Sequence, residues 1–145
     1  MTDTLTPEGR SARMALIRSK DTKPEMVVRK AVWAAGFRYR LHAKHLPGKP
    51  DLVFPSLGVV VFVHGCFWHG HSCQKGRIPG ANSAFWRAKF EANRLRDRRN
   101  RAKLARMGWR VVVVWECSLS TRQKRDRTLK KLLDFLRLSR QDAAR

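Results

Sequence analysis

Cysteine and histidine side chains gather in the short segment 66–73, which directly follows an apolar run of mostly β-branched residues. Zinc in a structural site takes four nitrogen or sulfur ligands in a tetrahedron. The three cysteines of the chain are Cys66, Cys73 and Cys117, the last of them after a second apolar run. If the two runs are neighbouring strands, the cysteines meet at one end of a sheet. The spacing therefore predicts a zinc site completed by either His69 or His71, and three ordinary buried cysteines are the alternative.

Asp51 is the acidic residue best placed for chemistry beside this segment. It follows a turn rich in proline and glycine and opens a short strand. A second turn joins that strand to the run 59–64, which predicts a hairpin. We therefore expect Asp51, the backbone around Val63, and either His64 or His69 to gather near one sheet edge.

Glu25, in the first turn of a helix predicted from residue 22, is the other acid expected to approach Asp51. Carboxylates, backbone carbonyls and water form the oxygen site that Mg²⁺ prefers. Mg²⁺ there would offset charge on a phosphorane-like transition state, while a neutral histidine takes a proton from water. The structural alternatives are a solvated turn acid for Asp51 and a capping box for Glu25.

Large aromatic residues stand next to the cysteines and histidines. Phe67 and Trp68 are adjacent, and Trp86 follows the start of a predicted helix. Rings raised over a basic surface stack on bases or wedge between base pairs, and a mismatched pair is easier to unstack. The alternative is that Phe67 and Trp86 pack around the zinc. The other tryptophans are assigned to the core: Trp33, Trp109 and Trp115.

The charge of the chain points to a polyanionic partner. The 145 residues contain 32 Lys and Arg against 11 Asp and Glu, a net charge of +21. Charge of this size opposes compaction unless a polyanion balances it, although a nonspecifically adhesive or ribosome-associated protein would share it. No apolar run approaches the roughly 20 residues that span a bilayer, and no secretory signal is recognisable. We expect a cytoplasmic protein with reduced thiols and no membrane partner.

The order of predicted elements is helix, three strands, helix, strand, helix. This order indicates an α/β sandwich with a mixed central sheet flanked by helices, in which the run 109–115 is apolar enough for the sheet centre. We expect residues 1–20 to form a flexible basic N-terminal arm, with a short helical stretch at 13–17, and residues 21–145 to form a single domain. The predicted elements are a helix 22–35, strands 37–41, 51–54 and 59–64, a helix from 82 or 83 to 107, the strand 109–115 and a helix after Thr121. The apolar stripe of the long helix is predicted at Phe85, Ala88, Ala92, Leu95 and Leu104.

Several segments together resemble the very-short-patch-repair (Vsr) DNA mismatch endonucleases. The matching segments are Gly65-Cys66-Phe67-Trp68-His69-Gly70-His71-Ser72-Cys73, Phe85-Trp86 with Asn93 and Arg96-Asp97, Gly108-Trp109-Arg110 through Trp115-Glu116-Cys117, Pro50-Asp51, and Thr22-Lys23-Pro24-Glu25. The resemblance covers about residues 8 to 138. It implies a restriction-endonuclease-like fold and nicking 5′ of the thymine in T·G mismatches that arise by deamination of 5-methylcytosine.

The resemblance also implies roles for individual residues. Zinc would take Cys66, His71, Cys73 and Cys117. Asp51 and the main-chain oxygen of Val63 would hold the catalytic Mg²⁺, and His69 would be the general base. Glu25 would bind metal-coordinated water, His64 would support the site or the proton transfer, and Asp97 would orient a neighbour. Double-stranded DNA would be bound by three groups of residues. Phe67, Trp68 and Trp86 would wedge into the base stack, and Lys89 and Asn93 would contact the bases. Met14 would contact the DNA from the N-terminal arm.

Two departures and two rival functions remain open at this stage. Restriction-enzyme folds usually carry an acid-x-Lys pair, but this strand reads Val61-Phe62-Val63, so His69 would have to substitute for the lysine. Val63 stands where some relatives carry a hydroxyl residue. The rivals are a non-catalytic zinc-containing DNA-binding protein and a zinc hydrolase. We expect a monomer associated with the nucleoid, and relatives suggest coupling to mismatch-repair proteins.

Overall fold

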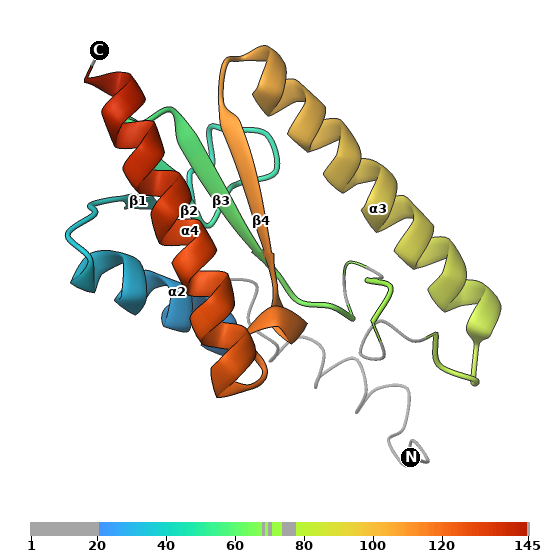
Figure 1. The fold of residues 1–145 in the computed structure, drawn as a ribbon. Coiled ribbons are helices and arrows are strands. Elements are labelled where there is room, and N and C mark those ends of the chain that lie inside the picture. Colours follow the sequence, from blue (N-terminus) through green and yellow to red (C-terminus); the bar gives the residue numbers. More distant parts are fainter. Residues whose placement is uncertain (1–20, 68, 70, 74–77, 145) are drawn as a thin grey trace.

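A four-stranded mixed sheet forms the centre of the computed structural model, which describes residues 21–67, 69, 71–73 and 78–144 (Figure 1). The strands lie in the order β1-β2-β3-β4. The first two pairings are antiparallel, and β3 pairs with β4 in parallel. The strands are β1 (Arg40–Leu41), β2 (Leu52–Phe54), β3 (Val59–His64) and β4 (Arg110–Trp115). The helices are α2 (Lys23–Ala34), α3 (Ser83–Arg106) and α4 (Arg122–Ala143), with a 3₁₀ turn, η2 (Glu116–Leu119), between β4 and α4.

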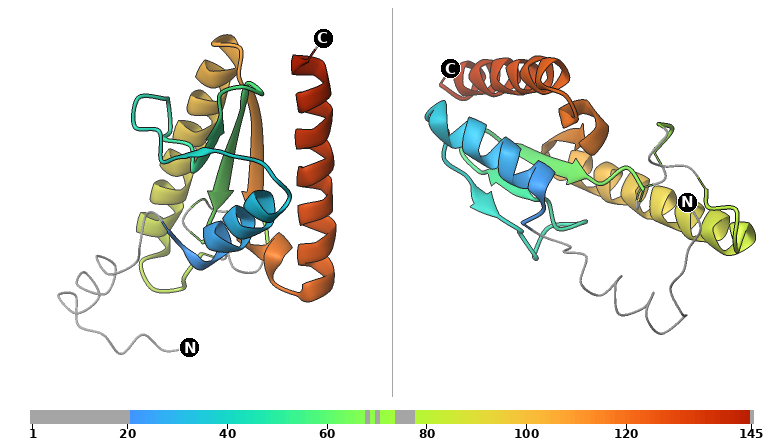
Figure 2. Two further views of the ribbon diagram at one scale, coloured as in Figure 1. Left: turned by 90° about the vertical axis from the view of Figure 1, so that its left-hand side faces the viewer. Right: turned by 90° about the horizontal axis from the view of Figure 1, so that it is seen from below.

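Helices cover both faces of the sheet, as two further views show (Figure 2). Val59 and Val61 of β3 pack with residues of α2 and α4, whereas Val60 and Phe62 pack on the opposite face with Leu104 of α3. A strand buried on both faces is apolar at every position rather than at alternate ones. The run 59–64 is therefore apolar at nearly every position. Its predicted bounds match those of β3.

Helix starts follow the capping residues seen in the sequence. The Thr22 hydroxyl accepts a hydrogen bond from the Glu25 backbone N–H (3.3 Å), and the Thr121 hydroxyl accepts one from Lys124 (3.2 Å). Asn82 stands at the N-cap of α3 but has left-handed backbone angles and makes no side-chain capping bond. The predicted order of elements is confirmed.

The position of β4 in the sheet differs from the prediction. The run 109–115 was expected at the sheet centre, but β4 is the edge strand beside β3. Both faces of β4 are covered, one by α3 and the other by α4. This edge strand is therefore as apolar as a central strand usually is. The first strand is also shorter than predicted, because Phe37 is buried in the core and the pairing with β2 begins only at Arg40.

The assignment of Trp33 to the core is wrong, because its side chain is 51% exposed. The Arg38 guanidinium lies 3.6 Å from the centre of its ring and shields one face from water. Trp109 packs against the core on the α3 face, and Trp115 is half-buried.

The buried face of α3 is also rotated from the predicted stripe. Trp86, Phe90 and Leu104 are buried, whereas Phe85 and Leu95 are 60% and 44% exposed. The first turns of α3 extend past the strand ends and lie beside the loop after β3 (Figure 1). They pack against Phe67 of that loop rather than against the sheet.

None of the helices in the described part of the chain is long and apolar enough to cross a membrane. The predicted arm, with Met14, and Trp68 lie outside the described residues.

Candidate functional site

The loops that follow β3 and β4 lie side by side because these strands are parallel and His64 pairs with Trp115. Four side chains from the two loops converge there, with ligand atoms all within 4.8 Å of one another: Cys66, His71, Cys73 and Cys117. The backbone holds them in place. The His71 N–H donates to the Cys66 carbonyl (2.9 Å), and the Cys117 N–H donates to the Cys66 sulfur (3.3 Å).

This group has the donors and spacing of a closed metal centre. Three sulfur atoms and one imidazole nitrogen are a common tetrahedral set for zinc. Cys66 is fully buried, and burial raises the pKa of its thiol to about 12. A buried thiol loses its proton readily only when a metal ion binds the sulfur and stabilises the thiolate. The four residues therefore fit a bound cation. His71 is the histidine that joins the cysteines in this structure, and His69 lies elsewhere.

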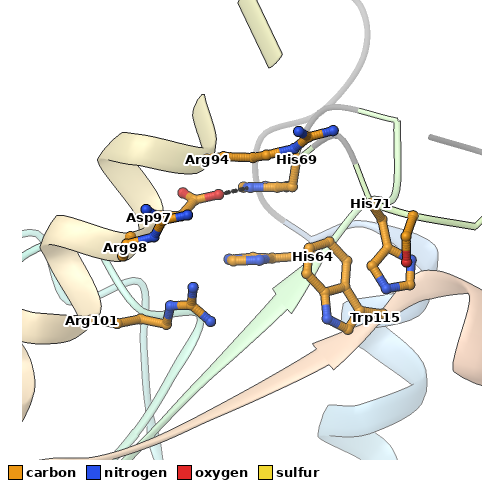
Figure 3. A pocket seen from close by; sticks show the side chains of 9 residues that line it. His64, His69, His71, Arg94, Asp97, Arg98, Arg101 and Trp115 are labelled. Atoms are coloured by element: carbon orange, nitrogen blue, oxygen red, sulfur yellow. Dashed lines mark hydrogen bonds and ion pairs between the residues drawn. The ribbon is translucent and has the colours of Figure 1, made fainter. Parts of the chain in front are cut away.

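His69 belongs to a second cluster, on the α3 face of the sheet. Its Nδ1 lies 2.5 Å from Oδ2 of Asp97, and its ring stacks on His64 with the ring centres 3.8 Å apart and the planes 3° from parallel (Figure 3). Burial raises the pKa of Asp97, but the hydrogen bond to His69 and the electrostatic effects of the nearby His69, His64 and Arg96 side chains together lower that pKa overall. Asp97 thus stays ionised and holds the imidazole in one orientation.

His64 is an uncharged imidazole in this cluster. Burial, and secondarily the neighbouring His69, lowers the pKa of His64 to about 3. Its Nδ1 is buried and has no hydrogen-bond partner among the described residues. A neutral ring packed flat against His69 fixes the plane of the His69 imidazole.

Asp51 and Glu25 form a third cluster, at the end of the sheet near α2. The Val63 N–H donates to Oδ2 of Asp51 (2.7 Å). Burial and the nearby Glu25 carboxylate together raise the pKa of Asp51 to about 7, against the lowering effect of the Val63 N–H. Two neighbouring carboxylates, one buried and one half-buried, are an arrangement that a divalent cation would stabilise.

Three groups hold Glu25, which is only 1% exposed: the side chains of His42 and Arg29, and the backbone N–H of Asp21 (3.3 Å). The His42 ring nitrogen Nε2 lies 3.0 and 3.1 Å from its two carboxylate oxygens. Arg29 lies 3.3 Å away and also pairs with Asp21. Asp21, Glu25 and His42 place one ligand atom each within 4.8 Å of the others. The sequence analysis missed His42, whose nearness to Asp51 follows from the pairing of its N–H with the Asp51 carbonyl (3.1 Å) just beyond the β1–β2 ladder.

The end of β3 connects the second and third clusters. Val63 and His64 are consecutive, so their side chains point to opposite faces of the sheet. The structure thus brings Asp51 to the Val63 backbone, as expected, and His69 to His64. Asp97 entered the sequence analysis only through the family resemblance, and its contact with His69 depends on the packing of α3.

Two of the proposed DNA-contacting aromatics, Phe67 and Trp86, pack against each other. The Phe67 ring centre lies 5.2 Å from that of Trp86 and 5.2 Å from that of Phe90. Trp86 is 9% exposed, so these rings support the loop after β3. On the same helix Lys89 is exposed and Asn93 is half-buried.

A cavity of about 190 Å³ opens beside the stacked histidines. Its walls come from the loop after β3, the end of β4 and one face of α3 (Figure 3). The lining residues are His64, His69, His71, Ser72, Arg94, Asp97, Arg98, Arg101 and Trp115. Fold and site together define a strongly basic α/β protein with an imidazole–carboxylate pair next to a cysteine-rich candidate metal centre.

Comparisons with known proteins give this class a family. The family model of the DNA mismatch endonuclease Vsr matches residues 2–75. The type II nicking enzyme V.XorIIP of Xanthomonas oryzae pv. oryzae is 52% identical over 134 residues, 92% of this chain and 98% of that protein. The DNA mismatch endonuclease Vsr of Escherichia coli K12 is 40% identical over 115 residues, 79% of this chain and 74% of that protein. The chain belongs to the Vsr family of DNA mismatch endonucleases, and its activity is that of an endonuclease.

Proposed function

We propose that the enzyme nicks double-stranded DNA immediately 5′ of the thymine in T·G mismatches left by deamination of 5-methylcytosine, in a Mg²⁺-dependent hydrolysis. The observation that carries the proposal is the pairing of His69 with Asp97 at the end of the strand whose Val63 N–H binds Asp51. A base and a cation site on the two sides of one strand end suit phosphodiester hydrolysis.

Each residue of the site would have its own role in the hydrolysis. His69 would accept a proton from the attacking water, with Asp97 holding its Nδ1 and His64 holding its plane. Asp51 and the main-chain oxygen of Val63 would hold Mg²⁺. That ion would supply charge stabilisation at the phosphate, and Glu25 would bind the water around it.

Zn²⁺ is proposed as a structural ion held by Cys66, His71, Cys73 and Cys117. Four side-chain donors would leave no open position for substrate, which favours this role over that of a zinc hydrolase. Zinc binding would then tie the loop after β3 to the end of β4 and contribute to folding. The restriction-endonuclease-like fold and a monomeric, cytoplasmic and nucleoid-associated enzyme are part of the same proposal. So is contact with mismatch-repair proteins.

Recognition of the mismatch is proposed for the aromatic residues and the start of α3. Phe67, Trp68 and Trp86 would enter the base stack, Lys89 and Asn93 would reach base edges, and Met14 of the arm would contact the opposite groove. Unstacking is least costly at a mismatched pair, so the wedge would favour T·G over T·A.

The test is a nicking assay on end-labelled duplexes that differ only in one T·G or T·A pair, with and without Mg²⁺. We expect one nick, 5′ of the mismatched thymine, only with T·G and Mg²⁺, and loss of it in His69→Ala. Tight binding of T·G duplex without cleavage by the wild-type protein would favour a non-catalytic zinc-containing DNA-binding protein. Repeating the assay with varied flanking bases would define the recognition sequence.

A further inference from the structure

Three arginines of α3 form one wall of the cavity beside the stacked histidines. Arg94, Arg98 and Arg101 are spaced by four and three residues, so they share the helix face that also carries Asp97. Figure 3 shows their side chains extending from the helix around the His64 and His69 rings. The cavity is therefore bounded by cationic side chains on one side and by the candidate general base on the other.

The charges at this cavity do not balance. Asp97 is the one carboxylate among the lining residues, and it is already bonded to His69. Arg94 pairs with Glu91 at the exposed outer side of the helix (3.0 Å). Within the described part of the chain, neither Arg98 nor Arg101 has an acidic partner. The positive field of Arg101 reaches His64, since it contributes to the lowered pKa of that imidazole.

The simpler explanation for these arginines is that they belong to an ordinary solvated helix face, because α3 carries arginine on several sides. Arg99 and Arg106 fit that explanation, since they are exposed and do not line the cavity. Arg98 and Arg101 differ because they line an open cavity of about 190 Å³ that His64 and Trp115 also line. That volume is several times the roughly 30 Å³ that one water occupies in the liquid, so the space admits a phosphate group with water around it.

We propose that this cavity is a phosphate subsite in which Arg98 and Arg101 bind the non-bridging oxygens of one backbone phosphate of the nicked strand, next to His69. The planar fork of the guanidinium matches two phosphate oxygens at once and keeps its charge at every working pH. Arg94 at the rim adds to the field that attracts the strand. The subsite deepens the proposed function and rests on it, since it assigns the groups that hold the substrate strand against the candidate base.

The first test measures binding of a T·G duplex without Mg²⁺ as a function of salt concentration. Each phosphate contact contributes about 0.9 to the slope of log affinity against log salt. Arg98→Gln and Arg101→Gln should each lower the slope by up to about 1, equally on matched and mismatched duplexes, because phosphate contacts do not read sequence. Arg127→Gln, the same charge change on exposed α4, is the matched control and should leave the slope unchanged.

The second test uses inorganic phosphate alone and does not depend on nicking. Phosphate should shift the NMR signals of the His69 ring in the wild-type protein and in Arg127→Gln, but not in the Arg98→Gln/Arg101→Gln double variant. Thermal unfolding of that variant should match the wild type, because both side chains are exposed. In single-turnover nicking we expect the double variant to be slower by about 10²-fold, the effect typical of a misplaced substrate.

The outcomes separate the subsite from the proposed function. A wild-type protein that shows the phosphate shift but does not nick T·G duplex would refute the nicking proposal while supporting the subsite. An unchanged salt slope and an unchanged phosphate shift in a folded double variant would overturn the subsite. An equal loss of slope in Arg127→Gln would also overturn it, because net charge rather than a site would then explain the binding.

Discussion

Replacing Asp51 by asparagine should make the protein more stable and inactive at the same time. Burial and the neighbouring Glu25 raise the pKa of Asp51 from 3.8 to about 7 in the folded protein. An acid with a raised pKa binds its proton more tightly in the folded than in the unfolded state. The stability that this proton confers is present at low pH and is lost as the pH rises from about 4 to about 7.

The size of this loss follows from the pKa values. A difference of about three pKa units, at about 1.36 kcal/mol each, sets an upper bound near 4 kcal/mol on the stability lost by pH 8. Asp51 is half-buried and shares its surroundings with Glu25, so we expect about 1–3 kcal/mol. Asparagine is uncharged at every pH and still offers an oxygen to the Val63 N–H. Asp51→Asn should therefore unfold at a temperature about 3–10 °C higher than the wild type at pH 8.

The assay is thermal or urea unfolding at pH 5 and pH 8 with zinc content verified and no other divalent ion added. The difference in stability between the two proteins should be clearly smaller at pH 5 than at pH 8. Adding Mg²⁺ at pH 8 should stabilise the wild type more than the variant, because an ion that binds the folded state raises its stability by mass action. Asp126→Asn, a change of an exposed acid on α4, should shift stability by at most about 0.5 kcal/mol. A zinc-replete Asp51→Asn that is less stable than the wild type at pH 8, or equal Mg²⁺ stabilisation of both, would refute the reasoning.

Further predictions concern all three clusters. Cys117→Ser should lose zinc and unfold at a much lower temperature, as metal analysis with calorimetry would reveal; a stable variant with full zinc would exclude this residue as a ligand. His69→Ala should keep its zinc, its fold and its affinity for T·G duplex while losing nicking, and zinc loss would mean that the two loop histidines have exchanged roles. Asp97→Asn should slow nicking by about 10²-fold or more and change its pH profile, since the partner that fixes the imidazole becomes neutral; an unchanged profile would argue against that contact. His42→Ala should lower the free energy of unfolding by about 1–3 kcal/mol, because buried Glu25 loses a hydrogen-bond partner, whereas His42→Gln should recover part of it.

Local sequence patterns predicted the elements that position the site. The bounds of β3 follow from a run of β-branched residues ended by glycine, the start of α4 from the capping residue Thr121, and the extent of α3 from helix-forming composition. These are properties of neighbouring residues, so they can be read without knowing the fold. The nearness of Asp51 to Val63 also belongs here, because one hairpin with a short turn fixes it.

Features that depend on layers packing together were predicted less well. Trp33 and Phe85 are apolar but exposed, and β4 is apolar but lies at the sheet edge. Composition reports how apolar a segment is, whereas its position depends on what covers it. The loop after β3 covers the start of α3, and this contact rotates the buried face of the helix toward Trp86 and Phe90.

The sequence by itself determined the chemistry available: three thiols, imidazoles in one short loop, a carboxylate at a strand start and a large positive charge. The tertiary structure decided which imidazole meets which partner. His69 and His71 are two residues apart in an irregular loop, where no periodicity assigns either of them a direction. The parallel pairing of β3 with β4 brings Cys117 to His71, and the packing of α3 on the sheet brings Asp97 to His69. Contacts between segments so distant in the chain arise only when the layers assemble, which is the physical reason that spacing alone left the choice open.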